Sequence, residues 1–452
     1  MTTRKKPGGL RALLLRLHFY AGVFVGPFIL IAAVTGLLYA VIPQVDNAVY
    51  RHELTVDRVG EQRLPLADQV AAVRAAHPVG AVESIRPPAA ADETTQVRLL
   101  VDDVPPGYAR TVFVDPYTAE LRGALTTYGQ WMPLRAWFDE LHRTLHLDEI
   151  GRNYSELAAS WLWVISLAGL VLWYLHRRDT QKLRRLALPE RDKKDRRRTL
   201  SWHGAVGVWI LVALLGLSVT GITWSRYGGQ SVDLIQQKLN TAAPTVDTAL
   251  GPRTGSEAAL SYGADTAWRT AERVGLHGPL WMYPPAQGGQ GWRVEENKRD
   301  WPTRHDAISV DPDTGAVTDR VNFTDWPFLA KLTDWAIDAH MGVLFGWPNQ
   351  IFLALTAIGL ITIVIRGYQM WWQRRPTRGS QWAVGPPPLR GAIRNLPPTA
   401  GVALVVAAAA LGWFLPLFGL SLAAFVVVDL VIGAVKQRRG AAEVKEKEFS
   451  DA

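Results

Sequence analysis

The sequence predicts an α-helical polytopic membrane protein of about six spans, built as two parallel repeats, with two extracytoplasmic α+β domains. Three observations indicate this fold class: long apolar runs without charge, basic clusters at alternate ends of these runs, and landmarks repeated at equal spacing. The chain has 452 residues, a net charge of +8 and no cysteine. The lack of cysteine excludes disulfide scaffolds, thiolate metal sites, thiol nucleophiles and haem attached covalently through Cys-x-x-Cys-His.

Six apolar runs are long enough, or nearly so, to cross a bilayer, which takes about 20 residues. The last two are short, and Pro416 between them predicts the turn of a helical hairpin. The first run is too long for a signal peptide and lacks a small-residue cleavage site, so we expect an uncleaved anchor. The runs cover 19–42, 155–175, 204–224, 349–372, 399–415 and 417–435.

Lysine and arginine cluster before the first run, between the second and third, after the fourth and after the sixth. Short basic loops stay in the cytoplasm, so we expect both termini inside and the segments 44–153 and 225–347 outside. The basic runs adjoin spans and carry no nucleic-acid-binding motif, so no nucleic acid partner is expected.

The predicted organisation alternates spans with connecting segments. The N-terminal tail and span 1 (1–43) precede a first outer domain with an interfacial helix (44–153), span 2 (154–176) and a basic cytoplasmic loop (177–202). Span 3 (203–224), a second outer domain with an interfacial helix (225–348) and span 4 (349–373) repeat this order. A cytoplasmic linker (374–398), a C-terminal helical hairpin of spans 5 and 6 (399–436) and a cytoplasmic tail (437–452) follow.

Four landmarks recur in both halves of the chain. A histidine precedes a Thr-Gly pair by 17 positions, and a second histidine precedes a Gly-x-x-x-Trp motif by 27. Both halves begin inside, so they are parallel repeats about an axis along the membrane normal, which brings equivalent residues face to face. The landmarks are His18 with Thr35-Gly36, His203 with Thr220-Gly221, His142 with Gly169, His340 with Gly367, and the Val-Asp-Pro turns at 114–116 and 310–312.

The outer domains have the pattern of small α+β units. Each shows one helix followed by short strands, and an aromatic amphipathic stretch suited to the membrane surface, at 131–138 and 326–335. Aromatic residues of the second domain (Trp281, Tyr283, Trp292 and Trp301) would form either a stacking surface or, as we favour, the core of a sheet. The expected elements are helices at 65–76 and 258–274 and strands at 82–86, 96–101, 110–114, 280–283, 292–295 and 308–310.

Four histidines occupy the repeated positions. The topology places His18 and His203 at the cytoplasmic ends of spans, and His142 and His340 on the outer side. Facing imidazoles in a helix bundle suit bis-axial ligation of haem iron, and without cysteine the haem is b-type. We therefore predict two haem b groups, with iron held by these four residues. Zinc is the competing metal, but two histidines make a poor zinc site and no His-Glu-x-x-His motif is present.

Three further residues are second-tier candidates. His146 follows His142 by one helical turn and would replace it or bind a propionate, and His176 ends the second span as an alternative inner ligand. Arg366 either extends to the membrane surface or pairs with a propionate. The remaining histidines, for which we expect ordinary surface positions, are His52, His77, His277 and His305.

These motifs together resemble the PepSY-associated transmembrane proteins, a family also described as iron-regulated or iron-uptake membrane proteins, over about residues 12–376. Ala339 before His340, the additional His146 and the terminal hairpin depart from the family pattern. The resemblance implies a protein of the bacterial inner membrane with two PepSY-like domains on its extracytoplasmic side. It also implies haem b groups that pass cytoplasmic electrons to an acceptor such as ferric iron in a siderophore, with the four repeated histidines in the family's histidine positions.

The resemblance thus predicts a haem-dependent ferric siderophore reductase. The inner loop is too short for a flavin or nucleotide domain, so a separate cytoplasmic reductase or a membrane quinone is the expected donor. The alternative is a membrane-anchored PepSY sensor or peptidase-regulating protein without redox activity. A permease is a third possibility, which the scarcity of carboxylates in the spans (Glu156 and Asp429) disfavours.

Overall fold

The computed structural model describes residues 9–190, 194–250, 259–375, 388 and 396–450. Two compact units divide the chain. The helical unit comprises Met1–Leu37, His142–Ile235 and Ala354–Ala452, and the sheet unit comprises Leu38–Leu141 and Gln236–Leu353. Each unit is therefore assembled from both halves of the sequence.

Five helices are long and apolar enough to cross a membrane, in agreement with a polytopic membrane protein. A sixth predicted span, α12 (Pro398–Phe414), is apolar but shorter. The N-terminal run is divided at Val25 between α1 (Gly9–Phe24) and α2. The five long segments are α2 (Gly26–Val49), α6 (Asp148–Asp179), α7 (Asp195–Thr223), α11 (Trp347–Trp372) and the first part of α13 (Pro416–Val435).

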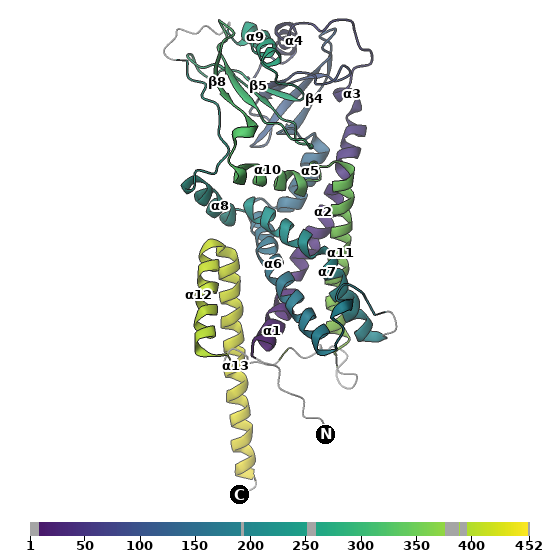
Figure 1. The fold of residues 1–452 in the computed structure, drawn as a ribbon, viewed down its shortest axis with the longest axis vertical. Helices are drawn as coiled ribbons and strands as arrows, with labels where there is room; N and C mark the ends of the chain where they lie inside the picture. Colours follow the sequence, from purple (N-terminus) through teal and green to yellow (C-terminus); the bar gives the residue numbers. More distant parts are fainter. Residues whose placement is uncertain (1–8, 191–193, 251–258, 376–387, 389–395, 451–452) are drawn as a thin grey trace. The chain divides into compact units, whose positions relative to one another are not determined.

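The terminal helices form the expected hairpin, with α13 (Pro416–Ser450) beginning two residues after α12 ends (Figure 1). A Cβ at Gly412 would lie 3.0 Å from the Gly419 Cα, so the two backbones cross closely. Within the helical unit, the hairpin contacts α6 and α1. Trp161 Nε1 donates to Ser421 Oγ at 2.9 Å, and Arg16 pairs with Asp429. Helix α13 also continues past residue 436, where the sequence predicted only a cytoplasmic tail.

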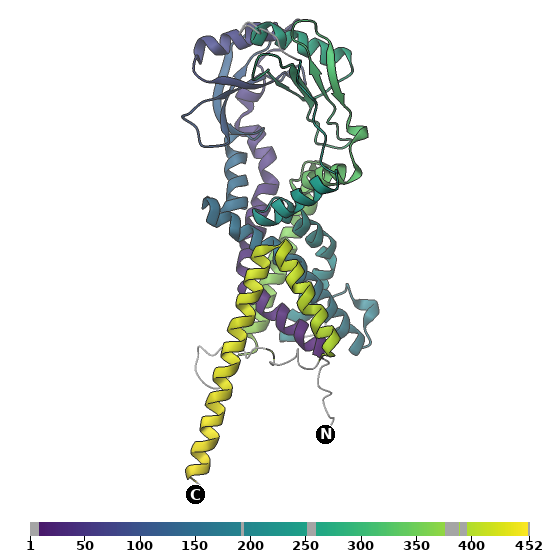
Figure 2. The ribbon, with the colours of Figure 1, turned by 90° about the vertical axis from the view of Figure 1, so that its left-hand side faces the viewer.

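The sheet unit contains one eight-stranded antiparallel sheet in the order β4-β3-β2-β1-β5-β6-β7-β8. The first half of the chain forms one side of this sheet and the second half the other (Figure 2). They join at β1 and β5, where Ile85 pairs with Met282. The strands are β1 (Ala81–Arg86), β2 (Thr95–Leu100), β3 (Tyr108–Val114), β4 (Leu121–Tyr128), β5 (Leu280–Tyr283), β6 (Trp292–Glu296), β7 (Ala307–Val310) and β8 (Val317–Val321).

This arrangement corrects the expectation of two separate outer domains. Helices α4 (Leu66–Ala76) and α9 (Ala259–Arg273) contact each other on one face of the sheet (Figure 1). One hydrophobic cluster, which includes Leu66, Val97, Ala267 and Trp292, draws on both halves. Two four-stranded sheets would each leave an edge strand open at β1 or β5, and pairing these edges satisfies their backbone groups.

The predicted helices and six strands are present, but β4 and β8 were not expected. Each follows a turn in which an aspartate side chain accepts backbone N–H groups: Asp115 from Tyr117 at 2.8 Å, and Asp311 from Asp313 at 3.0 Å. The aspartates of the repeated Val-Asp-Pro motif therefore close the hairpins that lead into β4 and β8. Short, partly exposed strands such as β8 lack the alternating apolar pattern that identifies a strand.

Four short helices and two 3-10 turns complete the described elements. They are α3 (Arg51–Leu54), α5 (Pro133–Thr144), α8 (Tyr227–Lys238), α10 (Phe328–His340) and the 3-10 turns η1 (Leu183–Arg185) and η2 (Phe323–Asp325). Helices α5 and α10 correspond to the two aromatic amphipathic stretches of the sequence. Each ends at or just after one of the two repeated outer histidines.

The contact of α9 with the fully buried Trp292 leaves no room for a side chain at Gly263. A Cβ there would overlap Trp292 Nε1 and lie 3.0 Å from Pro312 Cβ. We expect Gly263→Ala to destabilise the sheet unit by about 1–3 kcal/mol, because overpacking outweighs the helix propensity of alanine. The measurement is thermal unfolding of the detergent-purified protein. Gly207→Ala, at an α7 position with nothing within 4 Å, is the control, and equal melting temperatures would contradict the packing argument.

Candidate functional site

His18 and His203 lie side by side in the helical unit. His18 is on α1 and His203 on α7, and their ring centroids are 6.1 Å apart with the ring planes at 82°. The two residues occupy equivalent positions in the two repeats, 17 residues before a Thr-Gly pair. The structure thus brings together the inner pair of histidines, as the repeat symmetry predicted.

Each of these rings is held by one hydrogen bond to a backbone carbonyl of a neighbouring span. His18 Nδ1 lies 3.0 Å from the Ile165 oxygen of α6, and His203 Nδ1 lies 2.8 Å from the Ile363 oxygen of α11. A carbonyl only accepts, so Nδ1 carries the hydrogen in both rings and Nε2 carries a lone pair. A histidine that binds a metal through Nε2 commonly has this tautomer, with its Nδ1–H donated to a carbonyl or carboxylate.

A glycine lies next to each histidine ring, but only one of the two positions requires glycine. Gly169 and Gly367 lie four residues after Ile165 and Ile363, on the same faces of α6 and α11. A Cβ at Gly169 would lie 2.9 Å from His18 Cε1, whereas one at Gly367 would lie 3.8 Å from His203 Cε1, an ordinary contact. Gly169 therefore leaves the space that the His18 ring occupies, a role that the spacing of the Gly-x-x-x-Trp motif did not reveal.

Two arginines contact the aromatic residues that follow or precede the two histidines in sequence. The Arg366 guanidinium is 5.7 Å from the ring of Trp202, and that of Arg374 is 4.9 Å from the ring of Phe19. Both Nε atoms are buried and have no hydrogen-bond partner in the described part of the chain, although the two residues are partly exposed. Burial, with a contribution from Arg196, lowers the pKa of Arg374. A cationic N–H without an acceptor favours a nearby anion, and Arg374 was not among the candidates from the sequence.

His142 has a similar anchorage at the last turn of α5. The Thr35 hydroxyl donates to the Ile31 carbonyl at 2.9 Å, so its oxygen accepts from His142 Nδ1 at 2.9 Å. A Cβ at Gly36 would lie 3.1 Å from His142 Cε1, so Gly36 leaves the space that the ring occupies while Thr35 binds its Nδ1. Burial lowers the pKa of His142 to about 4, so the ring is neutral at physiological pH and its Nε2 can accept a metal.

His340 is the last residue of α10 and belongs to the sheet unit, whereas His142 belongs to the helical unit. The pairing of His142 with His340 therefore stays a prediction.

The second-tier histidines differ from expectation. Helix α5 ends at Thr144, and His146 lies beyond it, exposed and in a left-handed backbone conformation with φ of 55°. The assumption that His146 shares a helical face with His142 is wrong, because the helix does not reach it. The ring of His176 stacks on Trp173 at 5.5 Å, one turn earlier on α6.

His305, expected at the surface, is instead largely buried against Phe323 and Trp326. Trp281 and Trp292 are buried in the sheet unit, which confirms the core interpretation for these two residues, while Trp301 is exposed. An apolar sheet core offers no open stacking surface at Trp281 or Trp292.

The two carboxylates within the predicted spans both have structural partners. Glu156 is fully buried and accepts the Tyr227 and Gly228 N–H groups at 2.8 and 3.2 Å, at the N-terminus of α8. Asp429 pairs with the buried Arg16. The first N–H groups of a helix lack intrahelical acceptors. The Glu156 carboxylate accepts two of them, and its negative charge interacts favourably with the positive end of the helix dipole.

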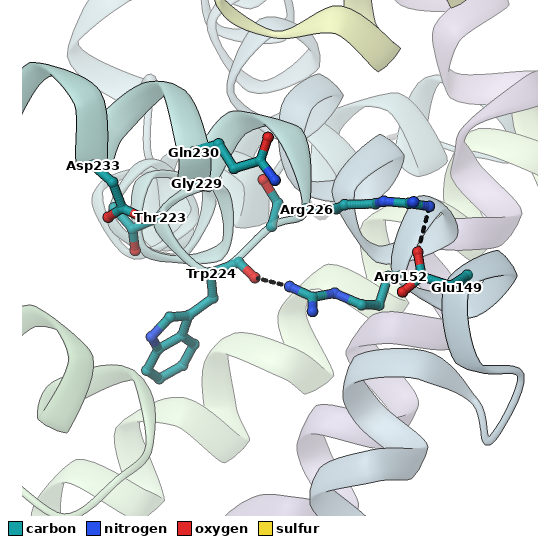
Figure 3. Close-up of a pocket in the computed structure, with 9 residues that line it drawn as sticks. Glu149, Arg152, Thr223, Trp224, Arg226, Gly229, Gln230 and Asp233 are labelled. Carbon is teal, nitrogen blue, oxygen red and sulfur yellow. Dashed lines mark hydrogen bonds and ion pairs between the residues drawn. The ribbon is translucent and has the colours of Figure 1, made fainter. Parts of the chain in front are cut away.

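A polar pocket of about 400 Å³ lies where α6 begins and α7 meets α8 (Figure 3). Its cationic side chains are engaged: Arg226 pairs with Glu149, and Arg152 donates to the Trp224 carbonyl at 3.3 Å. None of the residues that line it is a histidine. This pocket is therefore separate from the histidine site.

Comparison with known proteins identifies the family. No curated protein matches the sequence. The family model described as "PepSY-associated TM region" matches residues 15–374, which include both repeats, the inner histidine pair, His142 and His340. The terminal hairpin lies outside this match. The chain belongs to the family of proteins with a PepSY-associated transmembrane region.

Proposed function

We propose that the protein is a transmembrane haem b oxidoreductase that passes electrons from the cytoplasmic side of the bacterial inner membrane to an extracytoplasmic acceptor. The observation that carries this proposal is the juxtaposition of His18 and His203. The two ring centroids are 6.1 Å apart in the helical unit. His18 and His203 would hold the haem iron, because two neutral imidazoles from facing helices are a ligand set that haem iron accepts.

The chemistry of the surrounding residues also fits haem. Both rings have Nδ1 bound to a carbonyl, which leaves Nε2 for iron. Arg366 and Arg374, which contact Trp202 and Phe19, each have a buried Nε without a hydrogen-bond partner among the described residues, and such cationic groups suit the negative charge of propionates. His142 has the same tautomer, and a second haem held by His142 and His340 stays a prediction from the sequence.

In this function a bound haem b supplies one-electron transfer. The protein's residues do the remaining work. His18 and His203 hold the metal with their orientation set by α6 and α11, and the apolar side chains of the bundle exclude water. Arg366 and Arg374 add positive charge, which raises a reduction potential. The donor would be a separate cytoplasmic reductase or a quinone, and the family resemblance makes ferric iron in a siderophore the acceptor we favour.

A permease accounts less well for the same residues. Ionisable residues that face a water-filled cavity commonly mark substrate and ion pathways through a membrane. Glu156 and Asp429 are instead engaged with the α8 N-terminus and with Arg16. A sensor or peptidase regulator would use the sheet unit, but it would give no role to the buried histidine pair.

The proposal predicts a reduced-minus-oxidised absorption spectrum typical of bis-histidine haem b in protein purified from haem-replete cells. We expect His18→Ala and His203→Ala each to remove the same component, about half of the haem per chain, because both residues bind one iron. His77→Ala, in the sheet unit, is the control and should keep the full spectrum. A colourless wild-type protein, or loss of different components in the two variants, would contradict the proposal.

The glycines beside the two histidine rings give a second prediction, in which Gly169→Ala is compared with Gly367→Ala. Gly169→Ala adds a Cβ 2.9 Å from His18 Cε1, so we expect the ring to shift, the inner haem component to be lost or shifted, and the melting temperature to fall. Gly367→Ala adds a Cβ at 3.8 Å, an ordinary contact, and should leave the spectrum unchanged. Equal spectra for the two variants would show that these glycines do not position the histidines.

A further inference from the structure

Three side chains of the sheet unit direct metal-ligating atoms to one point. They are His305, which precedes β7, and Asp334 and Asp338, which lie one turn apart on α10. His305 Nε2 and one carboxylate oxygen from each aspartate all lie within 4.8 Å of one another. None of the three residues had been selected from the sequence, because His305 is 29 positions before Asp334.

These convergent atoms lack hydrogen-bond partners. Within the described ranges, His305 Nε2, Asp334 Oδ2 and Asp338 Oδ2 are each buried without a hydrogen bond. His305 Nε2 and Asp334 Oδ2 are 3.1 Å apart, but the ring N–H direction does not meet the geometry of a hydrogen bond. Buried polar atoms are normally satisfied, and three such atoms at one point indicate a missing shared partner.

The side chains are oriented by contacts on their other sides. The Asp338 side chain is fully buried, and its Oδ1 accepts from Arg299 Nε at 2.7 Å and also from Arg299 Nη2. The ring of His305 stacks on Trp326, with centroids 5.8 Å apart, and meets Phe323 edge to face at 5.1 Å. Arg299 thus leaves the second oxygen of Asp338 directed at the cluster. Supporting contacts of this kind are typical of the residues around a metal site.

Charge also favours a cation at this point. Two carboxylates approach each other in a largely buried environment; Arg299 pairs with Asp338, whereas Asp334 has only His305 Nε2 at 3.1 Å, which carries a positive charge only when protonated. Burying an uncompensated carboxylate is costly unless it is paired or bound to a metal. Ligand atoms on one small metal ion lie roughly 3 to 3.5 Å apart, so small side-chain rotations would complete the set.

We propose that His305, Asp334 and Asp338 form a binding site for a divalent transition-metal ion. One imidazole and two carboxylates suit Zn²⁺ or Fe²⁺, whereas Mg²⁺ and Ca²⁺ prefer oxygen ligands alone. Three protein ligands leave coordination positions for water or for an exchangeable ligand. This site uses only residues of the sheet unit, and it does not rest on the haem proposal.

The test is calorimetric titration of Zn²⁺ into the full-length protein in detergent, after treatment with a chelator. We expect one Zn²⁺ per chain at this site, and at least tenfold weaker binding in His305→Gln and in Asp334→Asn. Asp325→Asn, which removes a nearby exposed carboxylate outside the cluster, should bind Zn²⁺ like the wild type. Mg²⁺ at the same concentration should give no binding.

Melting temperatures without metal keep the test interpretable. Asp334 is partly exposed, so we expect Asp334→Asn to fold, whereas a change at Asp338 would also leave Arg299 without its partner. Absence of Zn²⁺ binding to the wild type, unchanged binding in both folded variants, or Mg²⁺ binding as tight as that of Zn²⁺ would overturn the proposal. His18→Ala should bind Zn²⁺ normally, so failure here is distinguishable from failure of the haem proposal.

Discussion

The histidine site depends on a hydrogen bond between an imidazole and the backbone of a neighbouring span. The carbonyls of Ile165 and Ile363 already accept intrahelical bonds and offer their second lone pair to His18 and His203. A side chain at position 169 would press on the His18 ring, and Gly169 leaves this space open, whereas a Cβ at Gly367 would make only an ordinary contact with His203. The two carbonyl bonds set the tautomer of both rings and hold each ring against a neighbouring span.

The landmarks that recur in the two halves of the sequence lie differently in the two units. In the helical unit equivalent histidines lie opposite each other, so a site arises from residues that are distant in sequence. In the sheet unit two four-stranded sheets join through β1 and β5, so that one core forms from both halves. Pairing of the two edge strands removes exposed backbone groups and lets α4 and α9 cover a common core.

Polar groups that are satisfied and those that are not indicate different roles. Arg16 with Asp429, and Glu156 with the α8 N-terminus, are complete interactions that connect helices. Among the described residues, Arg366, Arg374 and the cluster of His305, Asp334 and Asp338 contain buried atoms without a hydrogen-bond partner. Leaving such atoms unsatisfied is costly, and here they belong to charged groups whose sign suits a bound anion or cation.

The sequence by itself determined the membrane class, the hairpin, most helices and strands, and the repeated histidines, because hydrophobic runs and exact spacings are local properties. The tertiary structure decided the features that depend on contacts between distant segments. These are the continuous sheet, the close contact of the His18 ring with Gly169, and the burial of His305 next to Asp334 and Asp338. It also ended α5 before His146, because a left-handed turn replaces the helix there. Such features follow from packing between segments far apart in the chain, which periodicity along one segment does not encode.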